Sequence, residues 1–140
     1  MSNQELKSSI EVRVRFNETD ALGIVWHGNY LKYFEDGREA FGRAFGLSFL
    51  DIKKHGFTCP IVKTLVEHKK PLKYGDVATV ETQYMDSEAA KLIFHYSIKN
   101  ESNEIVCTGE TTQVFIEEAT GNMALVHPKF FKLWKQKKVY

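Results

Sequence analysis

The sequence has few of the residues that mark specialised protein classes. It contains two cysteines and three prolines in 140 residues, and no apolar run approaches the roughly 18 residues that a membrane-spanning helix needs. Cys59 and Cys107 are too few for a disulfide framework, so we expect reduced core residues, although the two could pair. The five histidines lack the spacing of a metal site, and neither a metal nor another cofactor is predicted.

The sequence also lacks an excess of charge of either sign. The formal net charge is +1, which predicts neither nucleic-acid binding nor stable association with a membrane. The beginning, MSNQELKSS, has no apolar core of a signal peptide, so we expect a cytoplasmic protein. The composition, 43% hydrophobic and 26% charged, is that of a globular chain. Without a repeat or a linker to divide it, we predict one domain over residues 1–140.

The periodicity of the apolar residues predicts an α+β fold. Apolar residues from Ile10 to Phe16 occupy every second position, which is typical of a half-buried strand. From Tyr30 to Phe45 they recur at steps of three and four, which predicts a long helix that stops at Gly46. Four strand-like segments follow, and their short connections favour an antiparallel meander. These segments are 61–70, 77–85, 92–98 and 105–116, and a short helix with Pro128 in its first turn completes the chain.

A sheet of five such strands can bury one apolar helix by wrapping around it. Gly37 lies on the apolar stripe of the helix, where glycine costs roughly 1 kcal/mol relative to alanine. We therefore expect the helix to approach the sheet closely at Gly37. The long strands leave an edge that a second copy of the chain would satisfy, so we predict a homodimer or a homotetramer.

The segment ETDALGIVWHGNY, which precedes the helix, carries the candidate chemistry. We expect the helix to begin near Gly28 with Asn29 as its N-cap. The backbone N–H groups of His27 and Gly28 would then lie at the positive end of the helix, where an oxyanion is stabilised. Asp20 precedes them, and a bend at Gly23 would fold its loop back. A carboxylate and an oxyanion hole facing one point are suited to acyl transfer.

The leaving group decides which acyl transfer this set can perform. A thiol has a pKa of about 8.5, so a thiolate leaves with little help from an acid, and one carboxylate with backbone donors suffices for a thioester. Asp20 alone would be read as a turn residue, but its spacing to the helix start favours catalysis. The His27 side chain is as well suited to orienting substrate as to chemistry. Glu18 would point away from Asp20 in an extended chain, so we expect it to be solvated.

The stretch DALGIVWHGNY followed by LKYFE resembles the hotdog-fold acyl-CoA thioesterases of the 4-hydroxybenzoyl-CoA thioesterase type, including the bacterial tol-pal-associated thioesterases. The order of the expected elements agrees over nearly the whole chain. The resemblance implies a hotdog fold, an antiparallel five-stranded sheet wrapped around one long central helix, with a short C-terminal helix. It further implies hydrolysis of acyl-CoA thioesters to the free acid and CoA.

The resemblance also assigns roles to individual residues. Asp20 is the implied catalytic carboxylate, as nucleophile or as general base, and the backbone N–H of His27 polarises the thioester carbonyl. At Asp36-Gly37 the chain departs from the family pattern, so the resemblance makes no prediction for the acyl-pocket end of the helix. A basic patch around His68 either meets the phosphates of CoA or is a solvated strand edge. The expected substrate-binding residues are Gly23, Val25, Tyr30, Glu35, Lys63, Lys69 and Lys70.

Two other functions compete with thioester hydrolysis. Hotdog-fold hydratases and dehydratases act on acyl thioesters through a histidine with a carboxylate partner, often in an H-F-P motif. No such motif occurs here, and His27 leads into Gly-Asn-Tyr instead. A non-catalytic domain that binds acyl thioesters is the third candidate, and the presence of Asp20 before the helix-start donors argues against it.

Overall fold

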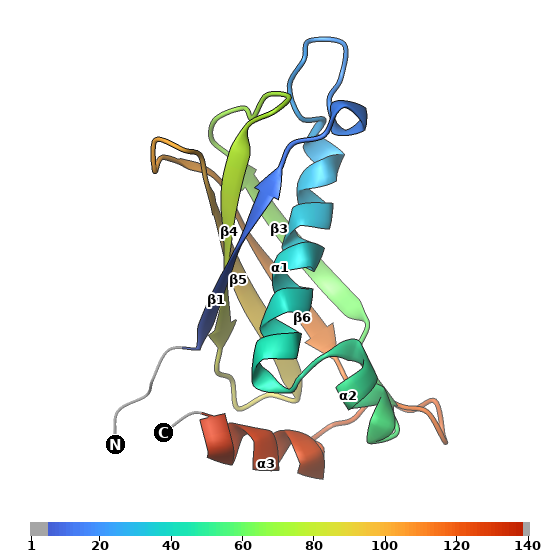
Figure 1. Ribbon diagram of the computed structural model, residues 1–140. Coiled ribbons are helices and arrows are strands. Elements are labelled where there is room, and N and C mark those ends of the chain that lie inside the picture. Colours follow the sequence, from blue (N-terminus) through green and yellow to red (C-terminus); the bar gives the residue numbers. More distant parts are fainter. Residues whose placement is uncertain (1–5, 139–140) are drawn as a thin grey trace.

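The computed structural model describes residues 6–138 (Figure 1). Residues 1–5, on which part of the expectation about a signal peptide rests, lie outside the described residues. Two 3-10 turns, Phe16–Glu18 and His27–Asn29, precede the long helix. The helices are α1 (Tyr30–Phe45), α2 (Phe49–Lys54) and α3 (Lys129–Lys138), and the strands are β1 (Lys7–Arg13), β2 (Phe57–Thr58), β3 (Ile61–His68), β4 (Val77–Met85), β5 (Lys91–Lys99), β6 (Ile105–Val114) and β7 (Ile116–Glu117).

The main sheet confirms the predicted antiparallel five-stranded sheet around one helix. Its strand order is β1-β4-β5-β6-β3, and α1 lies along one face (Figure 1). Strands β4, β5 and β6 form the expected meander, but β3 pairs with β6 and not with its sequence neighbour β4. Strand β1 occupies that edge of β4 instead. The connection through the turn at residues 73–76 therefore runs from β3, at one edge of the sheet, to β4, beside the opposite edge.

Helix α1 packs its aromatic stripe against this sheet. Tyr33, Phe34 and Phe41 are almost fully buried. A Cβ built on Gly37 would lie 2.9 Å from Val80 Cγ1 and even nearer to Thr82 Oγ1, both on β4. The predicted close approach at Gly37 is thus confirmed. The helix also stops where predicted, because Gly46 takes the left-handed conformation at φ +73°.

Some local predictions were wrong. Strand β1 ends at Arg13, and Phe16 is 76% exposed in a 3-10 turn, so it does not continue the buried alternation. Helix α2 and the small β2–β7 sheet were not predicted at all.

Cys59 and Cys107 are free thiols, as expected. Within residues 6–138, no helix is both long enough and apolar enough to cross a membrane.

Candidate active site

The loop that carries Asp20 is a closed turn at the start of α1. The backbone N–H of Trp26 donates to the carbonyl of Glu18 at 2.9 Å, and that of Asp20 donates to Ile24 at 2.8 Å. Gly23 has φ +79° and donates to the carbonyl of Asp20 at 3.0 Å. The predicted bend at Gly23 is therefore confirmed. Figure 1 shows this loop projecting beyond the N-terminal end of α1.

Glu18 anchors the loop, and the expectation that it is solvated was wrong. Its side chain is buried, and Oε1 accepts hydrogen bonds from Arg15 N and Tyr33 Oη, both at 2.8 Å. The 3-10 turn over residues 16–18 ends the extended chain, so strand alternation no longer decides where Glu18 points. Burial, reinforced by the bond to Glu18, raises the pKa of Tyr33 well above its usual range. The phenol therefore stays protonated and remains a donor to Glu18.

The start of the helix supplies backbone donors, as predicted, but the predicted side-chain cap by Asn29 is absent. Asn29 does not cap α1 with its side chain; its Nδ2 donates to the Glu18 carbonyl at 2.8 Å and ties the helix to the loop. The N–H groups of His27 and Gly28 open the 3-10 turn, and among residues 6–138 neither donates a hydrogen bond. A Cβ on Gly28 would collide with the Trp26 ring. Glycine therefore makes room for the indole at this position.

Asp20 lies exposed at the tip of this loop. Its Oδ1 accepts the N–H of Leu22 at 2.8 Å, while Oδ2 has no hydrogen-bond partner within the described part of the chain. The carboxylate is thus held by its own turn with one oxygen available. Such an oxygen can accept a proton from water or attack an electrophilic carbon.

A cluster of aromatic rings lies beside these donors. The exposed His27 ring is 4.8 Å from the Trp26 ring and 6.4 Å from that of His68 on β3. His68 also contacts Tyr30, with the ring centroids 5.1 Å apart. From its sequence neighbours, His68 was predicted only to belong to a basic patch. Its position two residues after Val66, on the face of β3 that turns toward α1, is the signal that would have placed it here.

The remaining predicted site residues are spread over several surfaces. Val25 and Tyr30 are buried in the core, and Gly23 and Glu35 are exposed. The three lysines do not form one patch with His68. Lys63 pairs with Thr112, which places it on the opposite face of β3 from His68. Lys69 Nζ lies 4.0 Å from Glu67 Oε1, and Lys70 forms an ion pair with Glu104.

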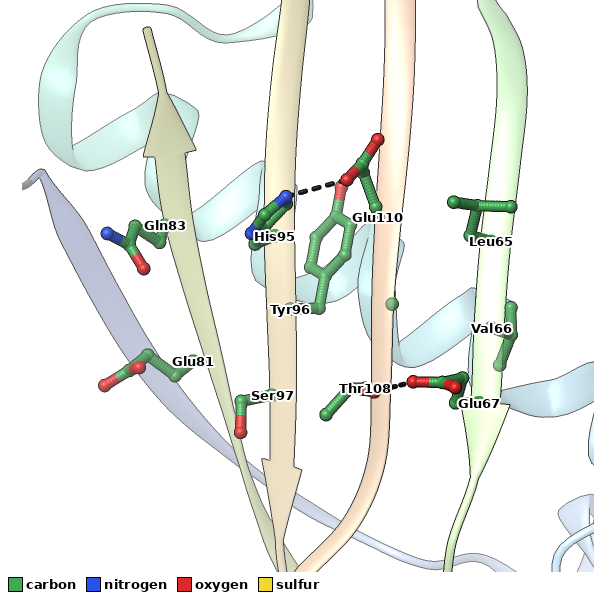
Figure 2. A pocket seen from close by; sticks show the side chains of 11 residues that line it. Leu65, Val66, Glu67, Glu81, Gln83, His95, Tyr96, Ser97, Thr108 and Glu110 are labelled. Carbon is green, nitrogen blue, oxygen red and sulfur yellow. Dashed lines mark hydrogen bonds and ion pairs between the residues drawn. The ribbon is translucent and has the colours of Figure 1, made fainter.

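Among the hollows on the described surface, two are well formed, and neither of these is lined by Asp20 or His27. The first runs between α1, α2 and the connection from β2 to β3, and it includes Glu35. The second lies on the face of the sheet opposite α1, where His95 Nε2 and Glu110 Oε1 are 2.7 Å apart (Figure 2). Asp20 and His27 therefore lie outside both of these hollows.

The chain is similar to several known proteins over most of its length. A family model described as "Thioesterase-like superfamily" matches residues 14–134. The putative acyl-CoA thioesterase YneP of Bacillus subtilis is 35% identical over 79% of this chain and 80% of its own length. The acyl-CoA thioester hydrolase YbgC of Escherichia coli is 26% identical over 76% of this chain and 79% of its own. The solved DHNA-CoA thioesterase of Staphylococcus aureus is 30% identical with a TM-score of 0.83, covering 93% of this chain and 87% of that one.

Proposed function

Because the chain belongs to the thioesterase-like superfamily and is an enzyme that acts on acyl-CoA thioesters, we propose that Asp20 and the start of α1 form its catalytic centre. The observation that carries this proposal is the pair of unpartnered N–H groups at His27 and Gly28, beside the closed loop that presents Asp20. In this assignment the two amides bind the thioester oxygen. Asp20 delivers the attack on the carbonyl carbon.

The chemistry needs no further group. As a general base, Asp20 takes a proton from water, and the resulting hydroxide adds to the thioester carbonyl carbon. The carbonyl oxygen then becomes an oxyanion that is bound by the two amides. The oxyanion collapses, the C–S bond breaks, and the CoA thiolate leaves without an acid because its pKa is about 8.5. As a nucleophile, Asp20 instead forms an acyl anhydride that water hydrolyses. Both routes yield the free acid and CoA.

The proposed assembly is a homodimer joined through β3, and a homotetramer would be a pair of such dimers. Strands β1 and β3 are the two edges of the sheet, and they differ in character. Strand β1 turns Lys7, Ser9, Glu11 and Arg13 to solvent, whereas β3 exposes Ile61, Val62 and Leu65 at 40%, 58% and 49%. An edge with exposed apolar side chains favours pairing with another strand, and a charged edge opposes it.

A two-fold pairing of β3 would complete the site. In an antiparallel pair the beginning of one strand lies opposite the end of the other. Ile61 of one copy would then face the His68 end of the partner's strand, the end that carries the aromatic cluster with His27. Ile61 also lines the hollow beside α1. The pairing would therefore bring the proposed catalytic segment of one copy to the hollow beside α1 of the other.

Light scattering tests this assembly. Lysines introduced at Val62 and Leu65 should place charge in the paired edge, lower the mass to that of one chain and reduce activity. Ser9→Lys adds a positive charge to the exposed β1 edge and should leave the mass unchanged. A wild-type monomer with full activity at micromolar concentration would refute the dimer.

The other proposed substrate contacts lie on the Asp20 loop, on α1, and on or just after β3. Gly23 and Val25 shape the loop, while Tyr30 and Glu35 extend the site along α1. The basic side chains assigned to the CoA phosphates are Lys63, Lys69 and Lys70. The ion pairs of Lys69 and Lys70 with glutamates would have to open in favour of phosphate, which carries more charge.

The experiment that tests the function is release of free thiol from a panel of acyl-CoAs. A thioesterase liberates CoA, whereas a hydratase or a binding domain does not. Asp20→Asn should lower kcat by at least the roughly 10²–10⁴-fold that loss of a general base costs. His27→Ala keeps the backbone donor and should lose less than the roughly 10²–10³-fold cost of deleting an oxyanion donor. If His27→Ala is the more damaged, the imidazole performs the chemistry and the assignment of Asp20 is wrong.

A further inference from the structure

Trp26 lies half exposed beside the proposed oxyanion donors, although tryptophan is among the most buried side chains on average. It is 50% exposed, whereas Trp134, the other tryptophan of the chain, is 7% exposed. The indole N–H of Trp134 donates to the Phe45 carbonyl at 2.7 Å, but that of Trp26 donates to no group within residues 6–138. Trp26 therefore keeps apolar ring surface and one hydrogen-bond donor available for a ligand.

The backbone determines where this ring lies. The N–H of Trp26 donates to the Glu18 carbonyl, and the Trp26 carbonyl accepts the N–H of Asn29, both at 2.9 Å. A Cβ built on Gly28 would collide with ring atoms Cζ3 and Cη2 of Trp26, so the six-membered ring lies directly against the backbone of Gly28. The indole is therefore a wall beside the unpartnered amides of His27 and Gly28.

A thioester whose oxygen is held by these amides has to pass close to the indole. The sulfur and the first carbon of the acyl group are both bonded to the carbonyl carbon, so either half of the thioester could contact the ring. Among residues 6–138 the His27 ring contacts the rings of both Trp26 and His68, whereas the Trp26 ring does not contact that of His68. The indole therefore lies farther from the His68 end of β3 than His27 does.

The acyl half of the thioester has an apolar place on the β3 side. In the proposed dimer, the hollow beside α1 of the second copy lies across the pairing of the two β3 strands. Its walls include Leu47, Ile52, Leu92 and Phe94, and apolar walls suit an acyl group. Because Trp26 lies farther from β3, the half of the thioester that runs along the indole is the CoA arm.

The chemistry of that arm suits the indole. Next to its sulfur, CoA carries the pantetheine arm, a neutral chain of methylene groups interrupted by two amides. Trp26 offers an apolar surface for the methylene groups and one N–H for an amide oxygen, and tryptophan is enriched where one side chain has to make both kinds of contact. The phosphates of CoA lie at the far end of this arm, and a neutral indole offers them no charge.

We propose that Trp26 is a substrate-binding residue that holds the pantetheine arm of an acyl-CoA, next to the sulfur, against its exposed ring. This inference rests on the proposed function, since it takes the amides of His27 and Gly28 as the site of the thioester oxygen. Covering the exposed half of such a ring corresponds to roughly 10- to 100-fold in affinity. The arm does not react, so the contact should lower KM and leave kcat little changed.

Fluorescence tests the contact directly, because the chain has only two tryptophans. Trp134→Phe leaves Trp26 as the reporter, and Trp26→Phe leaves Trp134, which lies on α3 at the opposite end of the molecule from the Asp20 loop (Figure 1). The probe is S-methyl-CoA, which keeps the arm and the sulfur but has no acyl group, at concentrations that inhibit thiol release. It should change the emission of the wild type and of Trp134→Phe and protect Trp26 from quenching by acrylamide. The emission of Trp26→Phe should not change.

Kinetic measurements separate the CoA arm from the acyl group. Trp26→Ala should raise KM by roughly 10- to 100-fold and change kcat by less than about 3-fold, and Trp26→Phe should restore most of the loss in KM. The factor in KM should be the same for butyryl-, hexanoyl- and octanoyl-CoA, because all three carry the same arm. Trp134→Phe is the matched control and should keep the KM of the wild type.

The outcomes separate this inference from the proposed function. No thiol release from any acyl-CoA overturns the proposed function and this inference with it. Thiol release together with an emission that S-methyl-CoA changes equally in the wild type and Trp26→Phe, or in neither, overturns the inference alone. If Trp26 is protected from acrylamide without a ligand, a second copy covers it, and the inference is wrong. A factor in KM that grows with the length of the acyl chain would place the contact on the acyl group and would also refute it.

Discussion

Tyr33→Phe removes one hydroxyl from the contact that holds the Asp20 loop against α1. The Tyr33 hydroxyl donates to the buried Glu18 carboxylate at 2.8 Å. A hydrogen bond to a charged group contributes roughly 1.5–3 kcal/mol. The phenylalanine ring keeps the edge-on contact with Tyr30, so packing changes little. The free energy of unfolding should therefore fall by about 1.5–3 kcal/mol, which lowers Tm by roughly 5–10 °C for a chain of this length.

The same substitution should also reduce catalysis, because in the proposed mechanism Tyr33 positions the Asp20 loop through Glu18. Glu18 keeps its bond from Arg15 N but loses its tie to the helix, while its carbonyl still receives Trp26 N and Asn29 Nδ2. A shift of about 1 Å between Asp20 and the helix-start amides costs up to roughly 10²-fold in rate. We expect kcat to fall by roughly 10-fold or more while KM changes little. The measurements are thermal unfolding and steady-state kinetics on one good acyl-CoA.

Tyr84→Phe is the matched control for this prediction. Tyr84 is also a buried tyrosine that donates to a carboxylate, Asp86 Oδ1 at 3.1 Å, but it lies on β4 away from the loop. Its loss should lower Tm and leave kcat unchanged. If Tyr33→Phe is destabilised yet retains full kcat, Glu18 does not position the loop. If Tyr33→Phe is no less stable than the wild type, the hydrogen bond to Glu18 contributes nothing.

Those parts of the fold that rest on local periodicity could be predicted from the sequence. The alternation of Ile10 and Val12 and the stripe along α1 each require only neighbouring residues. The partner of β3 could not be predicted in this way, because pairing with β6 is a contact between distant segments. Periodicity identifies which residues are buried in a strand, but it does not identify the strand beside it.

The candidate site shows the same division. The motif around Asp20 and the donors at the start of α1 are close in sequence, so the spacing of residues predicted them. The contact of His68 with His27 depends on how β3 lies against the helix. Alternation with Val66 places His68 on the inward face of β3, but it does not identify His27 as the neighbour. Glu18 was misjudged because a single 3-10 turn reverses the direction that an extended chain would give its side chain.

Three further predictions test the packing, the substrate contacts and the response to alkali. Gly37→Ala should gain about 1 kcal/mol from helix propensity but lose about 1–3 kcal/mol because the new methyl group overpacks against Thr82. Urea unfolding should therefore show a net decrease in the free energy of unfolding. Adding Thr82→Ala should restore part of that decrease. Replacing Lys69 and Lys70 by Gln should raise KM more than it lowers kcat. The difference in KM between variant and wild type should shrink in high salt, because salt screens the attraction between lysine and phosphate. An unchanged KM would show that the two lysines are only solvated side chains at the edge of the sheet. Burial, opposed by the charge of Lys69, raises the pKa of the Cys107 thiol from its ordinary 9.0 to about 12. The folded chain then keeps a proton that the unfolded chain loses, so the stabilisation is fully present below pH 9.0 and disappears as pH rises toward 12. The free energy of unfolding should be measured by urea titration under reducing conditions at several pH values above 9.0. It should fall with pH less steeply in Cys107→Ala than in the wild type, and the two slopes should differ by up to about 1.4 kcal/mol per pH unit. Equal slopes would refute the raised pKa of Cys107.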